Sequence, residues 1–336
     1  MRRAHLLASC LVALGLTLSA CGGDDDGGDD TPGAQDVAGG ETLAATWPLT
    51  GLPVKGDASS AKKHPVMVLK LDNTAASAPQ EGLGSADLVV EELVEGGMTR
   101  LAAFFYSELP DNAGPVRSMR ASDIGIVKPA DATMVTSGAA PVTIQRIKDS
   151  GIHFFAEGGP GFYRDSARSA PYNLFTDMGA TAKAAALDEE QRPDDYLPWG
   201  EAKDLPKGQP ARTVSAKFSG GHTTNWVFED GDYVNQNTYA ADGDEFLADT
   251  VLALRVQVGD AGYTDPAGNP VPETKFEGSG AALLFHDGRL VRGTWKKAGV
   301  AAPLKLSTKA GELTVPAGRT WIELVPAQDG DVTFGK

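Results

Sequence analysis

The first 30 residues carry the strongest signal in this sequence. An arginine pair at positions 2 and 3 precedes an uncharged apolar run from Leu6 to Leu18, and two small residues lead from there to Cys21. This order is typical of a secretory signal, and the apolar run is too short for a permanent membrane-spanning helix. We therefore expect residues 1–20 to be a signal peptide that is removed, so that the folded protein is built from residues 21–336.

The end of this segment, Leu18-Ser19-Ala20-Cys21, resembles the lipobox of bacterial lipoproteins. The resemblance implies cleavage before Cys21 and a diacylglyceryl group on its sulfur, so that the protein carries fatty acids such as palmitate. Two acyl chains anchor a protein stably, because each buried methylene contributes about 0.8 kcal/mol. We expect a membrane-anchored protein at the outer face of the cytoplasmic membrane. The alternative is an ordinary secreted protein with a chance cysteine, and the Gly-Asp tract that follows Cys21 counts against it.

Residues 21–46 consist largely of Gly, Asp, Thr and Ala. The aspartates repel one another and no apolar cluster is present, so this segment is predicted to be a disordered tether. As a flexible coil it would span roughly 25–30 Å. Its expected role is to hold the folded part away from the membrane.

Composition excludes several classes of protein. The two cysteines are Cys10, inside the signal, and Cys21, so the mature globular part offers no thiol for disulfides, zinc or nucleophilic catalysis. Loss of the two signal arginines leaves 28 basic against 45 acidic residues, a net charge of −17. Nucleic-acid binding is therefore not expected, because it requires a basic surface.

Residues 47–187 are predicted to form a mixed α/β domain. Apolar runs at 66–71, 88–94, 100–106 and 132–136 indicate strands, and 121–128, 141–148 and 176–187 indicate helices. The segment 95–98 is typical of a tight hairpin turn, with Gly96 and Gly97 supplying positive φ. Strands that alternate with helices favour a mixed α/β layer structure.

The proline-rich, charged segment 188–210 is predicted to be a linker, and the pattern changes beyond it. Short β-rich runs occupy 214–218, 224–228, 250–258, 281–285, 290–295 and 320–325, with turn residues between several of them. No convincing helix is present. Residues 211–336 are therefore predicted to be a smaller, mostly antiparallel β domain.

Familiar catalytic signatures are missing. The sequence has no GxSxG, HExxH, P-loop or GxGxxG following a strand. The four histidines of the mature chain, at positions 64, 153, 222 and 286, are not at metal-ligand spacing from one another and are predicted to be surface or edge residues. No metal and no cofactor is expected.

The remaining candidates are charged residues of the first domain. A two-residue turn at Gly96-Gly97 would pair Leu93 with Arg100, and would place Glu91 and Glu95 diagonally beside Arg100 on the same face. One interpretation is a cross-strand salt bridge, worth about 0–1 kcal/mol if exposed. The other is a polar cleft that binds an anionic or sugar-like ligand through arginine side chains.

The sequence resembles a group of uncharacterised proteins, the YerB-like lipoproteins. The phrases that carry the resemblance are WPLTGLP (47–53), VMVLKLDN (66–73), SADLVVEELVEGGMTRLAAFFYSELP (85–110), GPVRSMR (114–120), FYRDSARSAPYNLFT (162–176), LLFHDGRLVRGTWKK (283–297) and PAGRTWIELVP (316–326). It covers nearly all of residues 47–334 and implies two domains, an α/β one and a smaller C-terminal one. It implies no established activity.

The family's polar signature, carried over by matching phrases, gives the candidate site. Its residues are Asp72, Asn73, Glu91, Glu95, Arg100, Arg117, Arg120, Arg164, Asp165, Arg168 and Asn173. Relatives often carry histidine where this chain has Tyr172, and near 136–138. Its absence here argues against a histidine-dependent mechanism.

Two classes of function remain open. The first, which we favour, is a non-catalytic cell-envelope binding or scaffold protein that contacts wall polymer or an envelope protein. The second is an envelope hydrolase or transferase that uses paired carboxylates, such as Glu91 and Asp165, on cell-wall carbohydrate or peptide. Carboxyl groups facing each other across a deep pocket would favour the enzyme. Arginines paired internally on a shallow surface would favour the binding protein.

Overall fold

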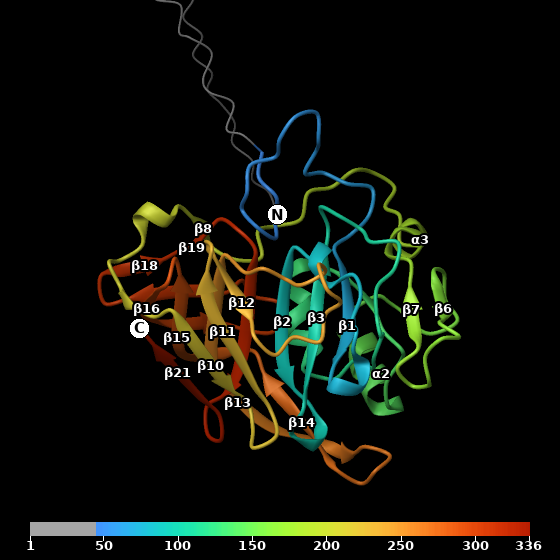
Figure 1. Ribbon diagram of the computed structural model, residues 1–336. Helices are drawn as coiled ribbons and strands as arrows, with labels where there is room; N and C mark the ends of the chain where they lie inside the picture. Colours follow the sequence, from blue (N-terminus) through green and yellow to red (C-terminus); the bar gives the residue numbers. More distant parts are fainter. Residues whose placement is uncertain (1–44) are drawn as a thin grey trace, which may run out of the picture. The chain divides into compact units, whose positions relative to one another are not determined.

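The computed structural model describes residues 45–336, which belong to one compact unit (Figure 1). The predictions for the signal peptide, for Cys21 and for all but the last residues of the acidic tether lie outside these residues. No helix among the described residues is long and apolar enough to cross a membrane.

One mixed sheet of 13 strands runs through both halves of the chain. Its strands in spatial order are β18 (Gly311–Leu313), β17 (Lys305–Thr308), β16 (Arg289–Lys297), β15 (Gly278–His286), β13 (Thr250–Thr264), β20 (Thr320–Pro326), β2 (Leu88–Leu93), β3 (Thr99–Phe105), β1 (Met67–Asn73), β4 (Thr133–Val135) and β5 (Phe154–Phe155). Two further strands join it, β14 (Pro270–Lys275) beside β13 and β9 (Gln209–Pro210) beside β16.

A second sheet of four strands packs on the main one. Its order is β12 (Asp232–Asn235), β11 (Thr223–Glu229), β10 (Thr213–Lys217) and β21 (Asp331–Gly335). Two small ladders pair β8 (Trp199–Gly200) with β19 (Val315–Pro316) and β6 (Phe162–Arg164) with β7 (Leu174–Thr176).

Helices are few and short. They are α1 (Asp123–Val127), α2 (Pro141–Asp149) and α3 (Met178–Ala184), with single 3₁₀ turns at Ala75–Ser77, Leu83–Ser85, Glu95–Gly97, Lys128–Ala130 and Ala202–Asp204. All three predicted helices are therefore present, with α3 ending at Ala184 rather than near Leu187. Proline at the first turn of α2 fits there because that position needs no backbone donor.

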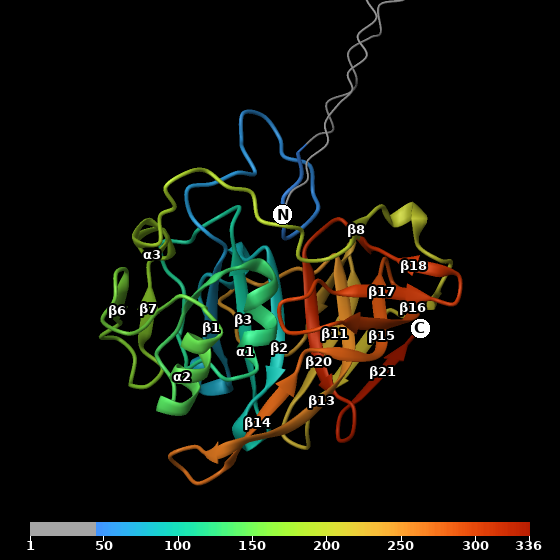
Figure 2. The ribbon, with the colours of Figure 1, turned by 180° about the vertical axis from the view of Figure 1, so that it is seen from behind.

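Two cores lie on the two faces of the main sheet. On one face Val90 and Ala102 pack with Ile126 of α1 and Ile147 of α2; we call it the helix-side face (Figure 2). On the other, Trp321 packs against Trp226 of the four-stranded sheet with ring centroids 5.1 Å apart; we call it the sheet-side face. Alternate residues of each central strand enter different cores.

The predictions of a strand-rich second half and a mixed first half are confirmed in outline. The α/β class predicted for the first half agrees only loosely with the structure. β4 and β5 are parallel to β1 around α2, but β3 runs antiparallel to both β1 and β2. The two halves also share backbone pairing, because β2 pairs in parallel with β20.

The segment 188–210 has little regular structure beyond β8, β9 and one 3₁₀ turn, and it is partly packed, since Tyr196 and Leu197 are buried in the helix-side core. Its predicted role as a linker between two separable domains stays a prediction. Limited proteolysis of the full chain tests it, and we expect the first cuts in the exposed stretch 201–208.

The predicted hairpin register is wrong by one residue. The turn comprises three residues, 95–97, because Gly96 and Gly97 both have positive φ and the Val94 N–H donates to the Met98 carbonyl at 2.8 Å. Arg100 therefore pairs with Glu92 rather than with Leu93. A slip of one residue transfers side chains to the opposite face, so Glu91 is not beside Arg100.

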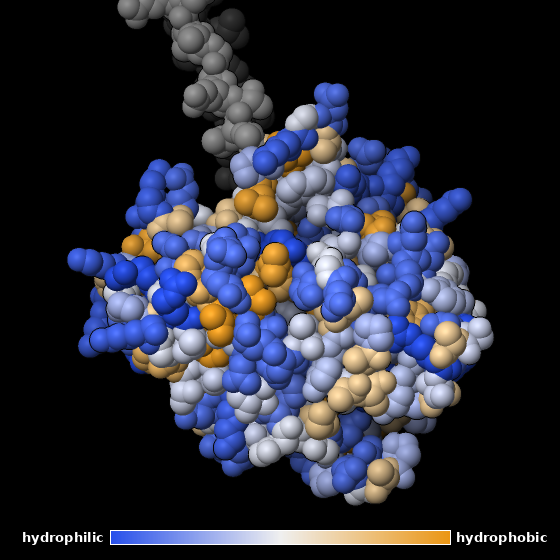
Figure 3. Space-filling model, in the orientation of Figure 1, coloured by the Kyte–Doolittle hydropathy of each residue, from blue (hydrophilic) through white to orange (hydrophobic). Residues whose placement is uncertain are grey.

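Exposed apolar side chains do not form one large surface. The large ones are Leu52, Val142, Tyr163, Leu247 and Val300. On the face shown in Figure 3, hydrophilic side chains dominate and apolar ones form small patches between them. Isolated apolar side chains of this kind are normal on protein surfaces.

Candidate functional site

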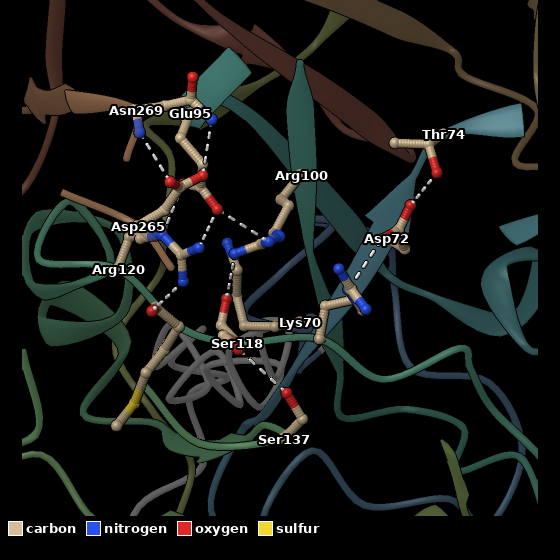
Figure 4. A network of polar contacts seen from close by, with 12 residues as sticks. Lys70, Asp72, Thr74, Glu95, Arg100, Ser118, Arg120, Ser137, Asp265 and Asn269 are labelled. Carbon is tan, nitrogen blue, oxygen red and sulfur yellow. Dashed lines mark hydrogen bonds and ion pairs between the residues drawn. The ribbon is translucent and has the colours of Figure 1, made fainter. Parts of the chain in front are cut away.

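Three arginines and two carboxylates meet on the helix-side face, and we call them the arginine cluster: Asp72, Glu95, Arg100, Arg117 and Arg120. Figure 4 shows Arg100 and Arg120 pointing toward Glu95. Arg120 donates from Nε to Glu95 Oε2 at 2.9 Å and from a terminal nitrogen to Oε1, and Arg100 Nη2 lies 3.2 Å from Oε1. Paired bonds of this kind fix geometry as well as charge.

Arg117 occupies the outer part of this cluster. Its Nε lies 2.8 Å from Asp72 Oδ2, and the other oxygen of Asp72 accepts a hydrogen bond from Thr74 at 2.5 Å. The Arg117 guanidinium lies over the Tyr172 ring, 5.2 Å from its centroid. Within residues 45–336 its terminal nitrogens donate no hydrogen bond, and its side chain is 21% exposed. Arg117 is thus the member with donors free for a ligand.

Crowding of like charges acts on Arg100. Burial and the neighbouring charges of Arg120 and Arg117 together lower the pKa of its guanidinium to about 10, against the opposing effect of Glu95. Arg100 is nonetheless held in place, because Nη1 also donates to the Ser118 carbonyl at 3.0 Å. A negative group placed near Arg117 and Arg100 would relieve this repulsion.

Beneath the arginine cluster lies a fully buried ion triad of Lys70, Glu92 and Asp123. Lys70 Nζ is 2.7 Å from Glu92 Oε1 and 2.8 Å from Asp123 Oδ1. Burial acts to lower the pKa of Lys70, but the two carboxylates outweigh it and the pKa is raised. Burial and the charge of Asp123 raise the pKa of Glu92 to about 7. None of the three residues was among the site candidates predicted from the sequence.

A second polar group, which we call the seam cluster, occupies the sheet-side face. It is centred on Glu91 and Glu323, which are register partners on β2 and β20 and are both fully buried. Glu91 accepts hydrogen bonds from His222 Nε2 at 2.9 Å and from the Thr224 hydroxyl at 3.0 Å. The prediction that His222 is a surface or edge residue is wrong, because it is 7% exposed and faces Glu91.

Neutral donors complete the seam cluster. Asn73 donates to Glu91 Oε1 at 3.0 Å, and Trp321 Nε1 to Glu91 Oε2 at 3.2 Å. Trp226 Nε1 donates to Glu323 Oε1 at 2.8 Å. Glu91 thus has donors from both halves of the chain and no exposed atom through which a substrate could reach it.

The remaining candidates lie elsewhere, near β6 and β7. Arg164 pairs with Glu157 at 2.7 Å and donates to Asn173. Arg168 pairs with Glu81 at 2.6 Å and with Asp165 at 3.3 Å. No contact joins these residues to Glu95 or Glu91. Of the candidates, the structure brings together Asp72, Glu95, Arg100, Arg117 and Arg120, and it separates Glu91, Asn73, Arg164, Asp165, Arg168 and Asn173 from them.

The sequence contains a weak signal for the buried charged residues that were not among the predicted candidates. Lys70, Glu92 and Glu323 are charged residues within strands that are otherwise mostly apolar, a pattern that a buried polar partner explains. The sequence did not show which partner each would find. Within residues 45–336, no group of three or more His, Cys, Asp or Glu side chains is arranged to hold a metal ion.

Comparison with known proteins gives consistent matches across both halves. Residues 49–191 match the family described as "Protein of unknown function (DUF3048) N-terminal domain", and residues 213–322 match its C-terminal domain. "Putative lipoprotein YerB" of Bacillus subtilis is 28% identical over 297 residues, covering 84% of this chain and 86% of the relative.

A solved structure also matches. The crystal structure of the YerB protein from Bacillus subtilis has a TM-score of 0.71 at 21% identity, and the match covers 86% of this chain and 99% of that one. At this identity the match demonstrates a common fold, with strand-rich mixed sheets and few helices.

Proposed function

Because the chain belongs to the YerB-like family that the two DUF3048 domains define, we propose that it is a lipid-anchored cell-envelope protein that binds a ligand without catalysing a reaction. The lipobox-like sequence at Cys21 and the lipoprotein name of the relative support the anchor. We further propose that the folded part faces outward from the cytoplasmic membrane, because a secretory signal precedes it.

The binding surface that we propose is the outer part of the arginine cluster. The observation that carries it is Arg117, which keeps its terminal nitrogens free while Asp72 and Tyr172 hold the guanidinium in place. A planar guanidinium fixed in this way is suited to carboxylate or phosphate groups. Anionic wall polymer is therefore the ligand class that we propose, and an envelope protein with an exposed acidic segment is the alternative.

The hydrolase or transferase alternative receives less support. The carboxylate pair named for it, Glu91 and Asp165, does not converge, because Glu91 is enclosed in the seam cluster and Asp165 pairs with Arg168. The directly paired carboxyl groups, Glu91 and Glu323, are both fully buried. Glycosidic chemistry needs two carboxyl groups about 5–9.5 Å apart with the substrate between them.

The anchor is tested by replacing the lipidated residue. Cys21→Ala should leave either an uncleaved precursor or a soluble exported form, whereas the parent should remain in the membrane fraction. Intact mass of the mature parent gives the direct measurement. A mature N-terminus without lipid would contradict the anchor.

The binding surface is tested in the unlipidated full chain carrying Cys21→Ala. Purified wall fragments with and without their anionic polymer are titrated against this protein, against Arg117→Ala and against Arg164→Ala. We expect Arg117→Ala to weaken binding about tenfold or more, which corresponds to about 1.4 kcal/mol. Arg164→Ala is the matched control, because Arg164 is a partly exposed arginine outside the cluster.

Equal binding of the wall fragments by the Arg117→Ala variant and by the protein that retains Arg117 would contradict this binding surface. Mass spectrometry of the fragments after incubation gives an independent check on catalysis. Conversion of the fragments by the parent, lost in a carboxylate variant such as Asp165→Asn, would favour the enzyme instead.

A further inference from the structure

The seam cluster joins two strands that are far apart in the sequence. β2 lies within the residues that match the N-terminal family domain, and β20 begins at the end of those that match the C-terminal one. Glu91 and Glu323 are the last paired residues of the two strands. Their side chains share the sheet-side face and are both fully buried. The same residues therefore mark the seam between the domains and place two carboxyl groups next to each other.

The hydrogen bonds around the pair are unequal. Glu91 accepts donors at both oxygens, from Asn73, His222, Thr224 and Trp321. Glu323 accepts one, from a tryptophan at Oε1, whereas its Oε2 is buried and accepts none from the described residues. This arrangement is the one expected of an ionised Glu91 beside a protonated Glu323.

Among residues 45–336, one side chain brings positive charge to the seam. The groups that face the pair are Asn73 of β1, Thr99 of β3, Thr224 and Trp226 of β11, Trp321 of β20 and His222. All of them except His222 are neutral, and of the two carboxyl groups His222 contacts only that of Glu91. One histidine cannot compensate two adjacent buried carboxylates, and such pairs normally keep a proton.

We propose that Glu91 and Glu323 share one proton and form an acid-stabilised lock between the two domains. The shared proton resides on Glu323 Oε2 and is donated to Glu91. His222, protonated, completes the lock from the second domain. When the proton leaves, two negative charges face each other across the β2–β20 ladder, and the seam loosens as the pH outside the cell rises.

The directions of the pKa shifts agree with this lock. Burial and the charge of Glu91 raise the pKa of Glu323 well above 4.5, so its contribution is lost as pH rises toward that higher value. Burial acts to lower the pKa of His222, but Glu91 outweighs it and the pKa is raised. The stability that protonated His222 contributes is therefore also lost as pH rises. Burial acts to raise the pKa of Glu91, but His222 outweighs it and the pKa is lowered. The stability that ionised Glu91 contributes is therefore lost only as pH falls into the acid range.

Hydrogen exchange of the backbone amides in β20 measures the lock in the full chain carrying Cys21→Ala. After correction for the intrinsic exchange rate of each amide, the equilibrium constant for opening of β20 should increase about tenfold or more between pH 6 and pH 9. A tenfold change corresponds to one pKa unit. In Glu323→Gln the amide can donate to Glu91 without titrating, so the part of this dependence that Glu323 contributes should disappear, while the part that His222 contributes remains. Glu312→Gln, at an exposed glutamate of β18, should leave it unchanged.

Equal pH dependence in the parent and in Glu323→Gln would overturn the lock. If Glu323→Gln does not fold, infrared spectroscopy of the otherwise unsubstituted chain decides instead. A protonated carboxylic acid should be visible at pH 7 in the Glu92→Gln background, which removes Glu92, a second buried carboxyl whose pKa is raised, to about 7. No protonated carboxyl signal at pH 7 would overturn the proposal.

Discussion

Glu91 and Glu92 are neighbours in β2, yet they enter two different environments. Glu92 lies on the helix-side face and is held by the cation Lys70, with Asp123 competing for the same ammonium. Glu91 lies on the sheet-side face and is held mainly by neutral donors and one histidine. Both carboxyl groups are fully buried. The comparison shows two ways to accommodate a buried acid, by an opposite charge or by hydrogen bonds from neutral donors and one histidine.

The two environments should respond differently to loss of a partner. Lys70→Met leaves Glu92 and Asp123 buried without their cation, and we expect a loss of about 3–5 kcal/mol in the free energy of unfolding. Urea unfolding at pH 7 gives the value. The double variant Lys70→Met/Glu92→Leu removes one of the stranded acids and should recover part of the loss. A loss below about 1 kcal/mol in Lys70→Met would contradict the role of the triad.

The arginine cluster should separate into a structural and an exposed part. Arg100 is buried and donates to Glu95 and to the Ser118 carbonyl, so Arg100→Ala should cost about 2–3 kcal/mol of stability. Arg117 is the more exposed, and Arg117→Ala should cost about 1 kcal/mol. Thermal and urea unfolding of the two variants side by side measure the difference. Equal losses would show that Arg117 is as structural as Arg100.

The helix-side acid should also make stability depend on pH. The pKa of Glu92 is raised to about 7, so the folded protein keeps a proton that the unfolded chain releases above its ordinary pKa of 4.5. Stability should therefore fall as pH rises from 4.5 to 7, by on the order of 2 kcal/mol. Lys70 does not add to this slope, because its raised pKa keeps it charged throughout this range.

Unfolding midpoints of the parent, Glu92→Gln and Glu323→Gln across this range separate the two faces. Each variant should reduce the slope of the free energy of unfolding against pH, because both glutamates have raised pKa values. A parent whose stability rises steadily from pH 4.5 to 7 would be incompatible with both assignments.

The smallest effect is expected for a single neutral donor of the seam cluster. Thr224→Val removes one hydroxyl from Glu91 and keeps the shape, while the other donors remain. We expect a loss of about 1 kcal/mol. Urea unfolding of this variant beside Thr213→Val, at an exposed threonine in β10, isolates the hydroxyl. A loss as large as that of Lys70→Met would mean that Glu91 depends on this one donor.

Much of the secondary structure could be predicted because it depends on local pattern. The apolar strands of the first half and the helix that begins at Pro141 were placed within a few residues. Strands such as β6 and β21 were missed, because they are short and lack an apolar run. The α/β expectation for the first half was too strong, because two of the three helices extend over only five and seven residues.

The candidate site was predicted in part. Arg100, Arg117 and Arg120 do meet, because the chain returns from β3 through 117–120 at the ends of β1 and β4. Arg168 does not join them, since its carboxylate partners are Glu81 and Asp165. The charges in the sequence did not indicate which carboxylate each arginine would pair with.

The sequence by itself determined the acidic composition and the apolar runs of the central strands, and it predicts an export signal. The tertiary structure decided which acid faces which partner, because side chains in a strand alternate with a period of two and one residue of register reverses the faces. That register depends on the positive φ of Gly96 and Gly97 and on the pairing of β2 with the distant β20. His222, 131 residues from Glu91 along the chain, reaches it only through that packing.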